Sequence, residues 1–463
     1  MDDLALVDRL RESLFNELPR LEKWSRYYEG TQPMSYMAPE LARELEGRVR
    51  QVVVNWPRLV VDALEERLDV EGFRIANTPD ERLWEWWQAN NLDEFSQMAH
   101  IDALTACRSY IIVGTQESGE VPLITVESPL QVIAKHDPRT RKVTSALKTW
   151  AEDDGTQRAT LYLPDRTVWL VSEGHESEAA DFLHPQVYGR AAANWRVEYT
   201  DQHNLGVVPV VPLVNRGRIL DQQGVSELAD ITPISDAACK IATDMMVSAE
   251  FHAIPRRWIV GMTEDDMTDA DGNTISKWDR IAGRIWASSG LPSEVQMGQF
   301  PEADLRNFHE TLKSLAHMVA AQAGLPAHVL GMPSNSSTNP ASADAIRSGE
   351  IRLVKRAERR QRAFGGSWEE AMRIAMLMVD GETSGESLET VWRDAATPTI
   401  AQRADAVVKL RTAGIISLRQ AREDLGYSEE QIVSMEADDS AAVDRLLGPE
   451  TFGPKPVEDE PEV

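Results

Sequence analysis

The chain has 463 residues, and its hydrophobic fraction of 42% and charged fraction of 27% are those of a folded protein of two to four domains. Two cysteines, Cys107 and Cys239, are too few for a disulfide framework. The apolar runs are too short to cross a bilayer, and the acidic start at residues 1–4 is unlike a signal peptide. Secretion and membrane insertion are therefore not expected. The 48 lysines and arginines against 75 aspartates and glutamates give a net charge of −27, which argues against a protein that holds DNA through clustered basic residues.

Helical patterns dominate the amino-terminal part of the chain. Leucine and valine at helical spacing predict an amphipathic helix over 1–28, ending at Tyr27-Tyr28-Glu29-Gly30. A second helix follows Asn55-Trp56-Pro57, with the proline in its first turn. A third begins at Thr78-Pro79-Asp80-Glu81, which reads as a capping box with proline at the first helical position, and runs to residues 90–91.

Three tryptophans lie close together on this third helix, namely Trp84, Trp86 and Trp87. Because neighbouring helical positions point in different directions, the three are not expected to face one core. We therefore expect at least one of them to contact another subunit or domain.

From about 109 to 214 the hydrophobic pattern becomes that of strands. Short β runs are predicted at 109–113, 122–126, 130–134, 143–151, 159–163 and 167–171. Turn sequences such as Asp137-Pro138-Arg139 and Asp154-Gly155 separate them. This part of the chain is predicted to be a mostly antiparallel sheet domain.

Two long helices are predicted on either side of a small β insert. The first begins near Thr232-Pro233 and runs to about 253, and the second begins at Pro301-Glu302 and ends at Gly324. Strands are predicted between them at 257–260, 280–286 and 294–297. We expect the two helices to be antiparallel, with the insert at one tip.

The carboxy-terminal part begins with a polar loop, 332–340, which has no apolar residue between its two prolines. A long helix over 341–378, interrupted by a kink at Gly365-Gly366, and a lone strand over 388–393 are predicted next. Capping boxes then predict three short helices, and the Pro-rich and Glu-rich tail that follows them is predicted to be disordered. The three helices are expected at 399–413, 417–425 and 428–446, and the tail after Gly448.

None of the catalytic signatures in this sequence is complete. His309 begins a motif like that of zinc helices, but Lys313 occupies the place of the second histidine. Residues 269–273 resemble a calcium loop that lacks its first and last carboxylates. Residues 114–119 have P-loop spacing, but Glu120 replaces the lysine. We therefore expect no catalytic residue, no metal site, no cofactor and no enzymatic activity.

One segment is basic against the acidic background. Between Asp344 and Arg362, seven basic and three acidic residues leave a local excess of four positive charges. The basic residues are Arg347, Arg352, Lys355, Arg356, Arg359, Arg360 and Arg362. Two interpretations stay open: a solvated helix face with intrahelical ion pairs, or a basic stripe that meets phosphates or an acidic neighbouring subunit.

The order of these elements resembles that of the portal proteins of tailed bacteriophages, the ring at one vertex of the capsid. Local motifs resemble those of long-tailed phages of actinobacterial hosts, and the resemblance covers nearly the whole chain. The motifs are Tyr27-Tyr28-Glu29-Gly30, Asn55-Trp56-Pro57-Arg58-Leu59-Val60-Val61, Glu71-Gly72-Phe73-Arg74, Ala249-Glu250-Phe251-His252-Ala253-Ile254-Pro255-Arg256-Arg257, Arg403-Ala404-Asp405-Ala406 and Gly414-Ile415-Ile416-Ser417.

The resemblance implies an α+β fold, mostly helical, with the family's wing, stem, clip and crown. The implied parts are a wing at 1–225, stem helices at 226–253 and 301–324 around a clip at 254–300, a tunnel loop at 325–342, a wing return at 343–393, crown helices at 394–447 and a disordered acidic tail at 448–463.

The resemblance also implies a function and partners. The protein would form a twelve-fold homo-oligomeric ring through which double-stranded DNA is packaged and ejected without sequence preference. Its other partners would be the terminase large subunit, the major capsid and scaffolding proteins and a head–tail adaptor, with no membrane. It would be assembled in the cytoplasm of the host bacterium and reside in the virion. The alternatives are another virion structural protein, such as a minor head protein or adaptor, and a metal-dependent hydrolase.

Two groups of site residues follow from the same mapping. The tunnel loop would present Asn335, Ser336, Ser337, Thr338 and Asn339 to passing DNA, with Arg347 and Lys355 just downstream. The clip would present Asp265, Asp266 and Asp269 to docking partners. An acidic ring suits such a channel, because it repels phosphate and lets the duplex slide.

Overall fold

The structure is a computed structural model that describes most of the chain. The described residues are 2–33, 52–76, 78–116, 119–152, 156–172, 194–252, 257–260, 296–299, 305–331, 343–383, 385–396, 400–427 and 429–447. They belong to two compact units, Met1–Ala395 and Ala396–Val463. The strand expected at 280–286, the polar loop at 332–340 and the acidic tail lie outside the described residues.

The first unit begins with the long amphipathic helix α1 (Asp3–Glu29), as predicted. Its buried residues form one stripe, which packs against the five-stranded sheet described below. They include Val7, Leu10, Leu14, Leu18 and Leu21. Gly30 ends the helix with φ of +72°, a left-handed conformation that glycine adopts without strain.

The next helices begin at side-chain caps. The elements in chain order are α3 (Trp56–Glu65), β1 (Val70–Ile75), β2 (Thr78–Pro79), α4 (Glu81–Ala89) and α5 (Leu92–Ala106). Asn55 accepts a hydrogen bond from the Arg58 amide at 3.3 Å and caps α3. The predicted capping box at Thr78 is wrong, because Thr78 lies in β2; Asp80 caps α4 and accepts the Leu83 amide at 2.9 Å.

Helix α5 was not predicted from the sequence. Its buried positions are mainly small or polar residues, including Ser96, Ala99, His100 and Ala103, so no stripe of large apolar residues marks it. Cys107 ends the helix with φ of +76°. The helix packs against strands that lie later in the chain, and burial of small side chains permits this close approach.

The strand region folds into two antiparallel sheets where the sequence predicted one mostly antiparallel sheet domain. Its strands are β3 (Arg108–Thr115), β4 (Pro122–Glu127), β5 (Val132–His136), β6 (Val143–Ala151), β7 (Gln157–Tyr162), β8 (Thr167–Ser172), β9 (Trp195–Asp201) and β10 (Val210–Val214). One sheet has the order β10-β3-β4, and the other has the order β5-β6-β7-β8-β9. The six predicted strands are confirmed, with ends shifted by up to two residues.

A third sheet joins an early segment and a late segment of the first unit. Strand β13 (Leu388–Trp392) pairs antiparallel with β1, with Phe73 opposite Thr390, and the sheet order is β13-β1-β2. The strand at 388–393 is therefore confirmed, but it is not alone. Its partner was missed because the two strands are separated by most of the chain.

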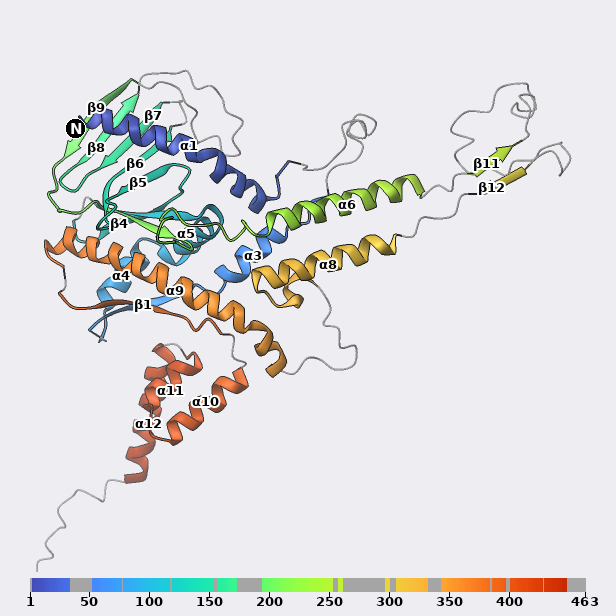
Figure 1. The fold of residues 1–463 in the computed structure, drawn as a ribbon. Coiled ribbons are helices and arrows are strands. Elements are labelled where there is room, and N and C mark those ends of the chain that lie inside the picture. The colour runs from blue at the N-terminus through green and yellow to red at the C-terminus, as the bar shows by residue number, and fades with distance from the viewer. Residues whose placement is uncertain are drawn as a thin grey trace, which may run out of the picture. The chain divides into compact units, whose positions relative to one another are not determined.

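Helix α9 (Ala343–Asp380) runs beside this sheet as one continuous helix (Figure 1). The predicted interruption at Gly365-Gly366 is wrong. Gly365 instead allows a close contact, because a Cβ atom there would lie 3.0 Å from the Trp392 indole nitrogen. The Thr390 hydroxyl donates to the Gly365 carbonyl at 3.2 Å, which fixes β13 on the helix.

Two further helices lie side by side and run antiparallel, as predicted (Figure 1). They are α6 (Thr232–His252) and α8 (Arg306–Ala323). Between them in the chain, β11 (Arg257–Val260) and β12 (Gln296–Gln299) pair antiparallel. A short 3₁₀ helix (Ala327–Leu330) follows Gly324, whose φ of +66° ends α8 as expected.

The three tryptophans of α4 contradict the expectation that they cannot share a core. Trp86 and Trp87 are buried in the largest apolar cluster, and Trp84 packs against the same cluster. The rings of Trp84 and Trp87 stack at 6.0 Å between centroids. Stacking on Trp87 brings the half-buried Trp84 to the same core, so all three tryptophans contact one core. The expected contact of one of them with another subunit or domain stays a prediction.

The second unit contains the three predicted capped helices, α10 (Ile400–Thr412), α11 (Leu418–Leu425) and α12 (Glu429–Leu447). Ser417 accepts the Gln420 amide at 3.0 Å, which confirms the second capping box. Gly414 and Gly426 have φ of +71° and +89° and end the first two helices. None of the described helices in either unit is long and apolar enough to cross a membrane.

Candidate functional site

The two predicted groups of site residues are not brought together by the structure. The tunnel-loop residues Asn335–Asn339 and the clip residues Asp265, Asp266 and Asp269 lie outside the described residues. Arg347 lies in α9, where its side chain is not described. Lys355 is exposed on α9 and donates to Glu358 at 2.8 Å.

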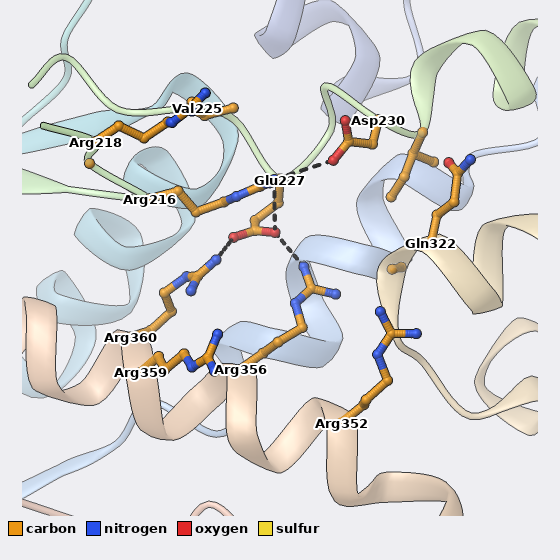
Figure 2. Close-up of a pocket in the computed structure, with 13 residues that line it drawn as sticks. Arg216, Arg218, Val225, Glu227, Asp230, Gln322, Arg352, Arg356, Arg359 and Arg360 are labelled. Carbon is orange, nitrogen blue, oxygen red and sulfur yellow. Dashed lines mark hydrogen bonds and ion pairs between the residues drawn. The ribbon is translucent and has the colours of Figure 1, made fainter. Parts of the chain in front are cut away.

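A different site stands out in the first unit. It is a cavity of about 630 Å³ between the 215–231 loop, which joins β10 to α6, the end of α8 and one face of α9 (Figure 2). We call it the arginine pocket. It is lined by Arg216, Gly217, Arg218, Val225, Glu227, Asp230, Ile231, Gln322, Ala323, Arg352, Arg356, Arg359 and Arg360.

The basic segment of α9 divides between two helix faces. Arg352, Arg356, Arg359 and Arg360 have helical spacing that places them on one face, and all four line the arginine pocket. On the neighbouring face, Lys355 and Arg362 both pair with Glu358, at 2.8 and 3.8 Å. The interpretation as intrahelical ion pairs is therefore confirmed for Lys355 and Arg362. Contact of the other face with phosphates or with an acidic neighbouring subunit stays a prediction.

Glu227 lies at the centre of the pocket with a fully buried side chain. Arg356 and Arg360 of α9 donate to its two carboxylate oxygens, and an Arg216 nitrogen lies 3.9 Å away. Burial opposes the ionisation of Glu227, but Arg356, Arg360 and Arg216 outweigh burial and lower its pKa. The buried carboxylate therefore stays charged and ties the 215–231 loop to α9.

A glycine with positive φ and several hydrogen bonds hold the base of the 215–231 loop in place. Gly224 has φ of +81°, and a Cβ atom there would lie 2.5 Å from the carbonyl oxygens of Asn215 and Cys107. The Asn215 side chain donates to the Val225 carbonyl at 2.7 Å, which closes the loop on itself. The Glu227 amide donates to the Leu104 carbonyl at 2.9 Å. These contacts fix the position at which Glu227 enters the pocket.

The pocket carries more positive charge than its own acids neutralise. Six arginines line it against the two acids, Glu227 and Asp230. Arg352 donates to the Ala321 carbonyl at 2.9 Å. Among the described residues, the side chains of Arg218 and Arg359 make no hydrogen bond or ion pair. Guanidinium groups bind carboxylates and phosphates in bidentate fashion, so the chemistry of the pocket is that of an anion-binding site.

Sequence reasoning found only the α9 part of this pocket. The basic stretch is visible because its residues are close in sequence, whereas Glu227 and Arg216 reach it from more than a hundred residues away. A loop with two glycines, Gly217 and Gly224, before a long helix does not by itself indicate a binding site. Within the part of the chain that the structure describes, no group of three or more histidine, cysteine, aspartate or glutamate side chains is arranged to hold a metal ion.

Comparison with known proteins gives matches over almost the whole chain. A family model described as "Phage portal protein, SPP1 Gp6-like" matches residues 8–444. The portal protein of Mycobacterium phage D29 is 36% identical over 445 residues, which cover 92% of this chain and 86% of that protein. The portal protein of Mycobacterium phage L5 is 37% identical over 449 residues, which cover 92% of this chain and 87% of that protein.

Solved structures of gene transfer agent particles are also similar. A chain from a structure described as the virion of a native particle matches with a TM-score of 0.46 and 13% identity, covering 88% of this chain and 99% of its own length. A chain from the neck of an empty particle matches with a TM-score of 0.43 and 14% identity, and the match covers 80% of this chain and 89% of that chain. The sequence matches alone decide the assignment, since the family model and both mycobacteriophage relatives span most of the chain: this chain belongs to the SPP1 Gp6-like family of phage portal proteins.

Proposed function

We propose that copies of this chain form a closed ring at one vertex of a phage capsid, through which double-stranded DNA enters during packaging and leaves during ejection. The observation that carries this proposal is the family match over residues 8–444. We expect twelve subunits in the virion. The ring would be assembled in the cytoplasm of the host bacterium, with scaffolding and major capsid proteins as neighbours.

The composition of the chain supports passage of DNA without capture. A net charge of −27 repels phosphate, so a channel built from this chain would keep a duplex centred and free to slide. Basic residues that neutralised the phosphates would instead hold the DNA and slow its translocation. We therefore assign the protein a structural role with no chemical step of its own.

The segment between α6 and α8 is the proposed docking site for the terminase large subunit and later for the head–tail adaptor. The antiparallel pair of β11 and β12 supports this, because two short strands alone make no core and would need neighbouring copies or partners to complete one. We expect charge reversal at Asp265, Asp266 and Asp269 to weaken binding of both partners while rings remain intact. Pull-down with each partner measures this, and unchanged binding of both would reject the site.

Electron microscopy of the purified protein tests the ring. We expect a closed ring with a central channel, and light scattering after size exclusion is expected to give a mass many times the 51.7 kDa of one chain. A stable two-fold dimer under all conditions, including in assembled capsids, would contradict the proposal, since a two-fold dimer uses up the contact that a ring needs.

A further inference from the structure

The 215–231 loop carries two exposed apolar side chains beside the arginine pocket. Ile219 is 78% exposed and Leu220 is 100% exposed. The tip is held in a defined turn, because the Arg218 amide donates to the Asp221 carbonyl at 2.8 Å and the Asp221 amide donates back at 3.1 Å. An ordered turn that presents two large apolar side chains to water is unfavourable unless another surface covers it.

The apolar tip and the pocket form one continuous feature. Arg216 and Arg218 lie in the same loop as the tip and line the pocket. A ligand that satisfies both parts must offer anionic groups to the arginines and apolar surface to Leu220. DNA phosphates meet only the first requirement, whereas a protein surface with carboxylates beside apolar side chains meets both.

We propose that the arginine pocket and the 219–220 tip form one face of the contact between neighbouring copies of this chain, and that the next copy inserts acidic side chains into the pocket. This inference rests on the proposed ring. In a ring the contact is head to tail, so each copy contributes two different faces, and a basic face requires an acidic one. With 75 acidic residues against 48 basic ones, a second copy of the chain is rich in the required groups.

The arginines of the pocket divide into two roles. Arg356 and Arg360 are held by Glu227 inside the chain, so they shape the pocket and are already ordered before a partner arrives. Arg218 and Arg359 have no such partner among the described residues, and both are exposed. These two guanidinium groups are therefore the ones that would receive carboxylates of the neighbouring copy.

A double variant, R218E/R359E, tests the charged part of the contact. We expect association to weaken at least tenfold, measured by sedimentation velocity, under conditions in which the unmodified chain closes into rings. A second variant, Leu220→Ser, is expected to give a smaller loss in the same direction. Arg362→Glu is the matched control, because it reverses the same charge on the exposed neighbouring face of α9 and is expected to leave rings intact.

Mixing the double variant with the unmodified chain distinguishes loss of this contact from misfolding of the variant. The double variant keeps its other face, so it is expected to add to unmodified copies and to stop closure, giving short open arcs in equimolar mixtures. Rings that form normally from R218E/R359E alone overturn the inference. If those rings also fail to retain DNA in assembled heads, the pocket receives phosphates of DNA instead. An unmodified chain that never forms a ring overturns the proposed function itself, and the inference with it.

Discussion

His100 joins α5 to α9 through a hydrogen bond in the core. Its side chain is fully buried, and the Trp368 indole donates to its Nε2 atom at 3.1 Å. The imidazole stacks on Phe364 at 5.3 Å between centroids. Burial lowers the pKa of His100 from 6.5 to about 3, so the ring is neutral in the folded protein at neutral pH.

The contribution of His100 to stability is therefore expected to fall as the pH drops below 6.5. The unfolded state binds a proton on His100 near pH 6.5, whereas the folded state resists it down to about pH 3, so protons favour unfolding in that window. The slope contributed by this one residue is up to ~1.4 kcal/mol per pH unit. Urea unfolding between pH 7 and pH 4 measures it. His100→Gln is expected to remove this contribution to the slope, whereas His309→Gln, at an exposed position of α8, is expected to keep it.

Glu227 supports the fold through its charge, whereas His100 supports it as a neutral ring. Replacement by glutamine keeps its size but leaves Arg356 and Arg360 without a carboxylate, and breaking a buried pair costs about 3–5 kcal/mol. Because the folded pKa of Glu227 is lowered, its contribution is present above the ordinary carboxyl pKa and is lost as the pH falls through the folded value.

We therefore expect Glu227→Gln to be strongly destabilised at pH 7 and the difference from the unmodified chain to shrink in acid. The denaturant midpoints of the variant and of the unmodified chain, measured at pH 7 and in acid, test this expectation. Glu85→Gln, at an exposed position of α4, is the control and is expected to change little. Equal midpoints for Glu227→Gln and the unmodified chain at pH 7 would show that the buried pair does not support the fold.

At the scale of the element, the adjacent glycines of α9 give opposite expectations. Gly366 is exposed with open space around its Cβ position, so Gly366→Ala is expected to stabilise the helix by up to ~1 kcal/mol. Gly365→Ala has the same helical gain but places a methyl group 3.0 Å from the Trp392 indole nitrogen, so we expect no gain or a loss. Thermal unfolding of the two variants compares them, and equal increases in Tm would contradict the close contact.

The elements that the sequence predicted well are those with local signals. Helix α1 has a stripe of leucines, and the α11 helix has a serine cap and a terminal glycine, so both were predicted within two residues. Helix α5 buries alanine, serine and histidine and gave no such stripe. The pairing of β1 with β13 depends on residues far apart in the chain, which a local pattern does not encode.

At the scale of the whole molecule, the candidate site was half predictable. The charge excess of the α9 segment is local and was recognised, but its division between Glu358 on one face and Glu227 on another depends on the fold. The family resemblance came from the order of elements and motifs and is confirmed by the match over 8–444. The clip and tunnel-loop residues stay predictions.

The tunnel loop has its own test at this scale. The residues 335–339 are all polar, so the hydrophobic effect does not favour their burial, and they can make transient hydrogen bonds to a moving duplex. Replacement of these five residues by glycine is expected to leave folding and ring formation unchanged and to reduce DNA packaging or retention in assembled heads. Packaging to the normal extent by this variant would show that the loop does not serve the channel.

The sheet that joins β1 to β13 also sets a limit on how early the first unit can be completed during synthesis. Arg393 donates to Glu71 across 322 residues of sequence at 2.9 Å, and α9, which supplies Trp368 to the core, emerges almost as late. At ~5–20 residues per second, a ribosome needs on the order of tens of seconds between the two strands. Throughout that interval Phe73, Trp86 and Trp87 lack part of the surface that covers them in the finished core. We therefore expect the nascent chain to expose part of this apolar surface until its last strand arrives.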